Sequence, residues 1–228
     1  MEKPPWLTCG AELRQPPEKQ LKQNSDREKW IIMETIVKSE TAEVVISDQK
    51  PFTIIGEKIN PTGRKKLAAA LTEGNYQAIR DLAVRQLEAG ADILDVNVGV
   101  PGLDEATVLP EVARLVAEVA PIPLCLDSAD RDALAAALAV LPGRPLVNSV
   151  NGEEASLQAV LPVAREFDVP VIGLLMDDDG IPADAEGRLS VAAKILERAA
   201  GMGIPPENVI IDPLVLTVGA DSQAGAVT

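Results

Sequence analysis

The sequence predicts an α/β fold, namely a (β/α)₈ barrel that is incomplete and contains about six βα units. Apolar runs of strand length alternate with Ala-, Leu- and Glu-rich segments of helical period, a pattern typical of parallel sheets. Polar residues follow most of these runs, as they do where a barrel builds its active face. The composition, 46% hydrophobic but only 2% aromatic, suits buried aliphatic strands.

The predicted elements alternate from Phe52 onward. In the first helix Ile79, Leu82 and Leu87 share one face, and Gly90 supplies the stop. We expect strands at 52–57, 91–99, 122–128, 145–150, 170–176 and 208–215, and complete helices at 75–89, 104–119, 130–140, 153–167 and 187–202.

A barrel is favoured over a doubly wound sheet. No G-x-G-x-x-G motif follows the first strand, where "GEKINPTG" stands, and the chain has no P-loop. The polar residues end many different strands, whereas a doubly wound sheet would concentrate them at one switch point. Because a full barrel needs eight strands, we expect a chain truncated after the sixth strand, or a second polypeptide that completes it.

The chain is predicted to have two parts. Residues 1–50 are polar, Pro-rich and aperiodic, which indicates an extension that is largely disordered or forms a lead-in strand. Residues 51–228 form the partial barrel. Met33 opens a strand-like piece, and we expect it to be the true start of translation.

Composition excludes several functions. A formal net charge of -14 argues against a nucleic-acid partner, and no apolar run reaches the roughly 18 residues of a membrane span. Two cysteines make no disulfide framework, so a cytoplasmic location is expected. The absence of histidine removes Ser-His-Asp catalysis and His-ligated zinc. Chemistry must use other side chains, a bound cofactor or another chain.

Asp127, in "LCLDS", is the leading candidate for a ligand-binding residue. It stands flush with the end of an apolar strand, which favours an inward-facing position, although it could also cap the next helix as Ser128 or Asp130 could. A carboxylate there accepts two hydrogen bonds side by side, which matches the N–H and amino edge of a pterin or guanine.

Further polar residues end other strands. Asp95 and Asn97 alternate with apolar residues and therefore share one face, either toward a ligand or in a self-satisfied polar layer. Asn148 and Asp212 repeat the Asp127 pattern on separate strands, and a ligand with N–H donors would offset the cost of burying such groups. Two more candidates, Glu57 and Asn60, follow the first strand.

Two charged stretches carry weaker signals. The acids of "MDDDG" (176–180) lie on one turn and rarely all face one ion, so no metal site is expected, although Asp177 is a candidate ligand contact. The run "GRKK" (63–66) could steer an anionic tail, but a solvated helix start is the preferred interpretation.

The ordered motifs "IIGEKINPTGRKK", "LDVNVG", "LCLDS", "VNSVN", "MDDDGIP" and "VIIDPLV" resemble the pterin-binding domain of corrinoid-dependent methyltetrahydrofolate methyltransferases. Dihydropteroate synthase is a more distant relative with the same barrel, so the sequence resembles it less. The resemblance covers about residues 52–217. It implies a pterin-binding (β/α)₈ barrel in which Asp127, Asn148 and Asp212 hydrogen-bond the pterin.

The implied reaction is methyl transfer from 5-methyltetrahydrofolate to the Co(I) form of a corrinoid (cobalamin) carried by a partner corrinoid protein. The family's asparagine at the end of the seventh strand has no counterpart here, so the catalytic residue is left unassigned and little activity of this chain alone is expected. The alternatives are a dihydropteroate synthase-like condensation and a non-catalytic pterin-binding or assembly subunit. A homodimer is a further possibility that the family suggests.

Overall fold

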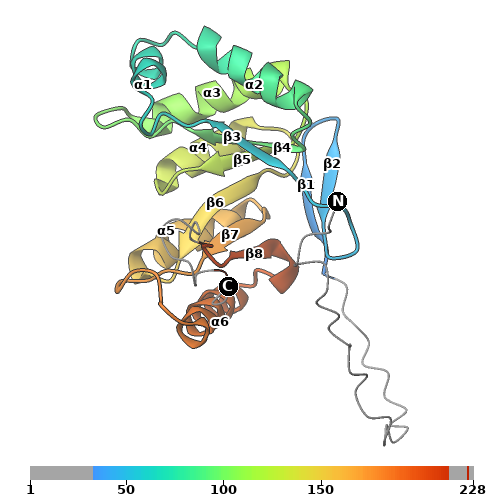
Figure 1. Cartoon of the computed structure of the whole chain (residues 1–228), viewed down its shortest axis with the longest axis vertical. Helices are drawn as coiled ribbons and strands as arrows, with labels where there is room; N and C mark the ends of the chain where they lie inside the picture. Colours follow the sequence, from blue (N-terminus) through green and yellow to red (C-terminus); the bar gives the residue numbers. More distant parts are fainter. Residues whose placement is uncertain (1–32, 216–224, 226–228) are drawn as a thin grey trace, which may run out of the picture. The chain divides into compact units, whose positions relative to one another are not determined.

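The computed structural model describes residues 33–215 and residue 225, and its centre is a six-stranded parallel sheet. Each strand pairs with the next one along the chain, in the order β3-β4-β5-β6-β7-β8 (Figure 1). Such an order, with helical crossovers, is that of a barrel wall. The predicted incomplete barrel of six βα units is confirmed. The strands are β3 (Ile55–Ile59), β4 (Ile93–Asn97), β5 (Leu124–Asp127), β6 (Leu146–Asn151), β7 (Val171–Leu174) and β8 (Val209–Asp212).

Six α-helices accompany this sheet in the described part of the chain, one more than the five complete helices predicted. The additional helix, α1, begins at Lys65, so the basic run at 63–66 does lead into a helix. The other five begin and end within two residues of the predicted bounds. The helices are α1 (Lys65–Thr72), α2 (Gln77–Glu88), α3 (Glu105–Val119), α4 (Arg131–Val140), α5 (Glu154–Glu166) and α6 (Ala185–Gly201), with a short 3₁₀ turn η1 (Pro206–Asn208) before β8.

The first predicted strand, 52–57, was placed too early. The strand β3 begins at Ile55, and the preceding Phe52 and Ile54 are 100% and 57% exposed. The apolar residues just before the strand have the same sequence pattern as a buried strand, because periodicity alone does not show whether a residue is buried. The pairing of β3 with β4 also has a register irregularity between Gly56 and Ile59.

The two faces of the sheet bury different partners. Leu94, Leu126 and Val147 belong to the large core formed with the helices. Their strand neighbours Ile93 and Cys125 point to the opposite, inner face, as the two-residue period of a strand requires. The small inner cluster comprises Val37, Ile93, Cys125 and Leu146, with Val44, Ile46, Ile55, Ile172 and Ile210 packed against it.

An antiparallel hairpin of β1 (Thr35–Lys38) and β2 (Glu43–Ile46) covers this inner cluster. Lys38 and Arg144 exchange two backbone hydrogen bonds of 2.8 Å, which join the hairpin to the chain just before β6. The Thr35 hydroxyl donates to the carbonyl oxygen of Glu207, 172 positions along the chain, at 2.6 Å. Of the predicted N-terminal extension, residues 1–32 lie outside the described part. The start of translation proposed at Met33 stays a prediction.

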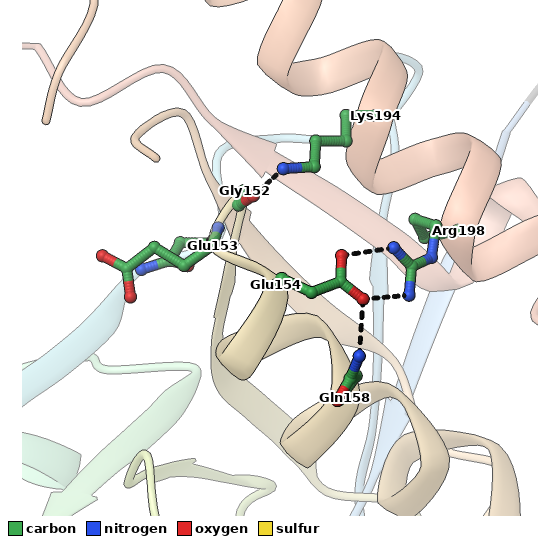
Figure 2. Close-up of polar contacts among 7 residues, drawn as sticks. Gly152, Glu153, Glu154, Gln158, Lys194 and Arg198 are labelled. Atoms are coloured by element: carbon green, nitrogen blue, oxygen red, sulfur yellow. Dashed lines mark hydrogen bonds and ion pairs between the residues drawn. The ribbon is translucent and has the colours of Figure 1, made fainter. Parts of the chain in front are cut away.

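A set of polar contacts joins α5 to α6 (Figure 2). The Arg198 guanidinium donates to both Glu154 carboxylate oxygens, at 2.5 and 2.8 Å, and Gln158 adds a third donor at 2.7 Å. These hydrogen bonds, from Arg198 first and Gln158 second, lower the pKa of Glu154 to about 2. Lys194 donates to the Gly152 carbonyl oxygen, so α6 also holds the loop that follows β6.

Candidate functional site

Polar side chains form a row across β4, β5 and β6, with Asn97 and Asp127 as the last residues of their strands. Asn148 was predicted at a strand end, but β6 continues to Asn151. Asn97 is aligned with Asp127, and Asp127 with Asn148, in the parallel register. One layer deeper, Asp95 is aligned with Cys125, and Cys125 with Leu146. Since Cys125 and Leu146 belong to the inner cluster, strand alternation places the polar row on the same inner face.

Two amide–carboxylate hydrogen bonds connect this polar cluster, which consists of Asp95, Asn97, Asp127 and Asn148. The Asn97 amide donates to Asp127 Oδ2 at 2.9 Å, and the Asn148 amide donates to Asp95 Oδ1 at 3.1 Å. The self-satisfied polar layer, one of the two interpretations of Asp95 and Asn97, therefore describes this arrangement. Each carboxylate still presents a second oxygen, which can accept a donor from a ligand.

Burial controls the electrostatics of the two acids. Burial, followed by the charge of Asp127, raises the pKa of Asp95 to about 6, although the hydrogen bond from Asn148 opposes the shift. Burial also raises the pKa of Asp127, with the Asn97 hydrogen bond opposing it and the charge of Glu105 adding to it. Both acids would gain from a ligand that offers N–H donors, because such donors stabilise the ionised form.

Cys125 lies beside Asp95, one layer below Asp127, and is fully buried. Burial first, and then the charge of Asp95, raises the pKa of its thiol well above the ordinary value. A thiol held in its neutral form is a poor nucleophile, so Cys125 acts as a small packing residue of the inner cluster.

Asp212 ends β8, where it is aligned with Leu174 at the end of β7. Its Oδ1 accepts the backbone N–H of Leu214 at 2.8 Å, across a turn in which Leu214 has a positive φ of 55°. The buried Arg188 donates to the carbonyl oxygens of Pro182, at 3.1 Å, and Pro213, at 2.5 Å. These contacts tie the Asp212 turn to the loop that follows β7.

The other three candidates form no hydrogen bond with the polar cluster in the described part of the chain, although the charge of Glu57 adds to the raised pKa of Asp95. Glu57 is an exposed residue within β3, so its predicted position at a strand end was wrong. The strand continues to Ile59, with a register irregularity between Gly56 and Ile59. Asn60 follows β3 and accepts the Thr62 N–H at 2.9 Å, which stabilises a turn. Asp177 likewise accepts the Asp179 N–H, at 3.1 Å, within its own turn.

The sequence interpretation missed one acid beside the cluster. Glu105, the first residue of α3, accepts the hydroxyl hydrogen of the buried Ser128 at 2.7 Å. Ser128 in turn accepts the N–H of Asp130, and Asp130 caps α4 by accepting the N–H groups of Asp132 and Ala133. Within the sequence Glu105 looks like an ordinary acid at a helix start, and no local signal brings it to Ser128.

Among the described residues, metal-binding groups and membrane-spanning helices are both absent. Across residues 33–215, no group of three His, Cys, Asp or Glu side chains is arranged to hold a metal ion. None of the helices described is long and apolar enough to cross a membrane.

Comparison with known proteins places this site in context. Residues 56–227 match the family described as "Pterin binding enzyme". The chain is 32% identical over 176 residues to a methylcorrinoid:tetrahydrofolate methyltransferase of Eubacterium limosum, a match covering 75% of this chain and 64% of that protein. It is 27% identical over 202 residues to methionine synthase of Mycobacterium tuberculosis, a match covering 86% of this chain but only 17% of that protein.

Solved structures share the fold. A dihydropteroate synthase of Xanthomonas albilineans, in complex with indole-2-carboxylic acid and 6-chloroguanine, superposes with a TM-score of 0.58 at 20% identity. The match covers 80% of this chain and 67% of that one. At this identity the likeness concerns the barrel alone. The chain therefore spans about two thirds or less of the proteins and structures compared here.

Proposed function

Because this chain belongs to the pterin-binding enzyme family, we propose that its polar cluster binds the pterin ring of a folate. The observation that carries the proposal is the row of Asn97 and Asp127, the last residues of β4 and β5, and Asn148, which is aligned with Asp127 within β6. A barrel binds its ligand at the carboxyl ends of its strands. The row offers carboxylate and amide oxygens to a ring edge that is rich in N–H donors.

Each residue has a distinct role in this proposal. Asp127 accepts the ring N–H and the neighbouring amino group through its two oxygens, while Asn97 holds the carboxylate in place. Asn148 turns its amide between Asp95 and the ring. Asp212, fixed by its bond to the Leu214 N–H, accepts a further donor from the ring. Asp95 remains beneath the ring as the partner of Asn148.

The reaction we propose is methyl transfer between the N5 atom of the folate and the corrinoid of a partner protein. The E. limosum relative bears a name in which the methyl group moves from corrinoid to tetrahydrofolate. Since a catalyst accelerates both directions, the same ring-binding residues serve transfer from 5-methyltetrahydrofolate to the corrinoid. The chain's residues orient the ring and exclude water around it, which positions N5 for an in-line transfer. A cytoplasmic location and a homodimer remain predictions.

A second candidate is dihydropteroate synthase-like condensation of a pterin pyrophosphate with an arylamine, because dihydropteroate synthase shares the barrel. Both reactions use the pterin-binding row, so ring binding does not separate them. The two reactions differ in the group attached to the pterin ring and in the second substrate. Binding of 5-methyltetrahydrofolate without binding of the pterin pyrophosphate supports methyl transfer, and the reverse supports condensation.

Calorimetric titration with 5-methyltetrahydrofolate tests the proposal. Replacing Asp127 by Asn keeps the shape but removes the acceptor that two ring donors share, so we expect binding to weaken by about tenfold or more. The matched control is Asp132→Asn, which makes the same charge change on the exposed face of α4. Equal affinity in both variants, or no binding by the unmodified chain, would contradict the pterin assignment.

A further inference from the structure

A basic segment stands beside the polar cluster on an otherwise acidic chain. Residues 58–72 contain four cations and no acid, whereas the whole chain has 21 Lys and Arg against 35 Asp and Glu. Three of these cations, Arg64, Lys65 and Lys66, open α1. The α2 residue Arg85 joins them in space, because it lines the same hollow.

Two adjoining hollows bring these cations together. The first, of about 420 Å³, is lined by Glu57, Lys58, Asn60, Thr62 and Arg64. The second, of about 490 Å³, is lined by Arg64, Lys65, Lys66 and Arg85, with Gly63, Leu67, Ala78 and Leu82 as its remaining walls. Arg64 lines both, so they adjoin at its side chain. We call the two together the basic hollow, defined by the five cations Lys58, Arg64, Lys65, Lys66 and Arg85.

The backbone that presents these cations is held in a fixed turn. Asn60 accepts the Thr62 N–H, and the Arg64 N–H donates to Pro61 at 2.9 Å. Gly63, between them, has a φ of 69°, which a residue with a side chain rarely adopts. The Arg64 guanidinium also donates to the carbonyl oxygen of Lys58. The amide oxygen of Gln86, a buried α2 residue, in turn accepts the Lys58 N–H at 2.7 Å.

The basic hollow begins next to the polar cluster. Glu57 and Lys58, which line its first part, lie on β3, and β3 pairs directly with β4, the strand of Asp95 and Asn97. Both parts of the hollow include residues of the loop that leaves the carboxyl end of β3. This is the end of the sheet at which the polar row lies.

The charges of the hollow have no ionic partner within the described chain. None of its five cations forms an ion pair with a carboxylate of residues 33–215. Like charges gathered around the basic hollow repel each other, and an anion bound between them relieves that repulsion. Building on the proposed function, we propose that the basic hollow binds the glutamate tail of the folate, an oligocarboxylate that extends from the ring.

The test compares 5-methyltetrahydrofolate carrying one glutamate with the same compound carrying three γ-linked glutamates. Exposed charge pairs are individually weak, so we expect the longer tail to bind about five- to tenfold more tightly to the unmodified 228-residue chain. Raising the salt concentration should reduce this gain, because exposed charges are screened.

The decisive variant combines Lys65→Gln, Lys66→Gln and Arg85→Gln. It should lose the gain from the longer tail while binding the one-glutamate compound within about twofold of the unmodified chain, because no residue of the polar cluster changes. The control combines Lys50→Gln, Arg114→Gln and Arg165→Gln, three exposed cations elsewhere, with the same change in net charge. This control should keep the full gain.

The outcomes separate the two proposals. No gain from the longer tail, or a gain that survives in the hollow variant, overturns the tail site while leaving ring binding intact. Equal loss in the control variant shows that net charge, and not the hollow, attracts the tail, and also overturns it. Failure of the unmodified chain to bind either compound overturns the proposed function, and the tail site falls with it.

Discussion

Asp95 is the most deeply buried acid of the polar cluster, with 4% of its surface exposed. It combines a raised pKa with a hydrogen bond from an amide, so it remains ionised at neutral pH only against the cost of burial. A carboxylate in this state is well suited to orient an amide that must also contact a ligand. The free energy of unfolding should therefore depend on whether Asp95 is protonated.

The pH dependence of stability tests this description of Asp95. Because its folded-state pKa, about 6, exceeds the ordinary value of 3.8, the folded protein holds the proton more tightly than the unfolded chain. Stability from Asp95 is therefore present at low pH and is lost as the pH rises through about 6. Relative to Asp95→Asn, the unmodified protein should lose about 2 to 3 kcal/mol of unfolding free energy between about pH 3 and pH 7.

Denaturant unfolding at a series of pH values measures this difference. Asp132→Asn serves as the control, because Asp132 is exposed and its substitution should leave the profile of the unmodified protein unchanged. Parallel profiles for Asp95→Asn and the unmodified protein would show that Asp95 titrates as an ordinary surface acid.

For single residues, the sequence predicted the face of the strand on which a side chain lies, but not the side chain that it contacts. The period of two placed Asp95 and Asn97 on one face, and the strand end placed Asp127 beside them. The pairing of Asn97 with Asp127 depends on the register between strands, which no single strand encodes. Glu105 was missed for a similar reason, since its contact with Ser128 spans 23 positions.

Among the elements, the β6–α5 connection is closely packed. A side chain added at Gly152 would place its Cβ 2.9 Å from Val191 Cγ1 and 3.0 Å from the Met176 carbonyl oxygen. Lys194 and the Glu154–Arg198 pair hold α6 against the same connection (Figure 2). The loop that follows the Asn148 strand therefore has little freedom to move.

Alanine substitutions at two glycines test this packing with opposite expected signs. Gly152→Ala should lower the unfolding free energy by about 1 to 3 kcal/mol, because backbone and α6 must shift to admit the methyl group. Gly201→Ala, at the end of α6, meets no atom within 4 Å and should raise it by about 0.5 kcal/mol or more. Thermal or denaturant unfolding measures both. Equal effects would contradict the packing argument.

The elements themselves were largely readable from sequence. The helical period fixed α2 to α6 because each buries one apolar face against the sheet. The strand β3 was misplaced because the exposed Phe52 and Ile54 mimic buried residues. The short α1 was anticipated only through its basic start, since eight residues barely establish a period.

The whole described molecule is organised around two unequal apolar clusters, one on each face of the sheet. The inner cluster is small, and its centre includes Val37 from the hairpin, which is completely buried. The consecutive strand order followed from the alternation of elements along the chain. The position of the hairpin could not be predicted, because nothing in residues 35–46 specifies which face of the sheet they cover.

Truncation of Val37 tests how much the hairpin contributes. Val37→Ala removes two buried methyl groups and leaves a cavity, so we expect a loss of about 2 to 3 kcal/mol in unfolding free energy. Val140→Ala is the control, because Val140 is 43% exposed and its loss should change stability by less than about 1 kcal/mol. Denaturant titration compares the two. A Val37 effect as small as that of Val140 would show that the hairpin lies loosely on the sheet.

The hydrogen bond from Thr35 to Glu207 has a consequence for the order of events during synthesis. The hairpin is made early, yet its partners are the inner faces of strands made later and a carbonyl group 172 positions downstream. Contacts this distant in sequence close slowly, and on the ribosome they must wait for the later residue to emerge. Strands β3 to β7 can therefore pair as they appear. The hairpin forms all of its contacts with the sheet only after residue 207 has left the exit tunnel.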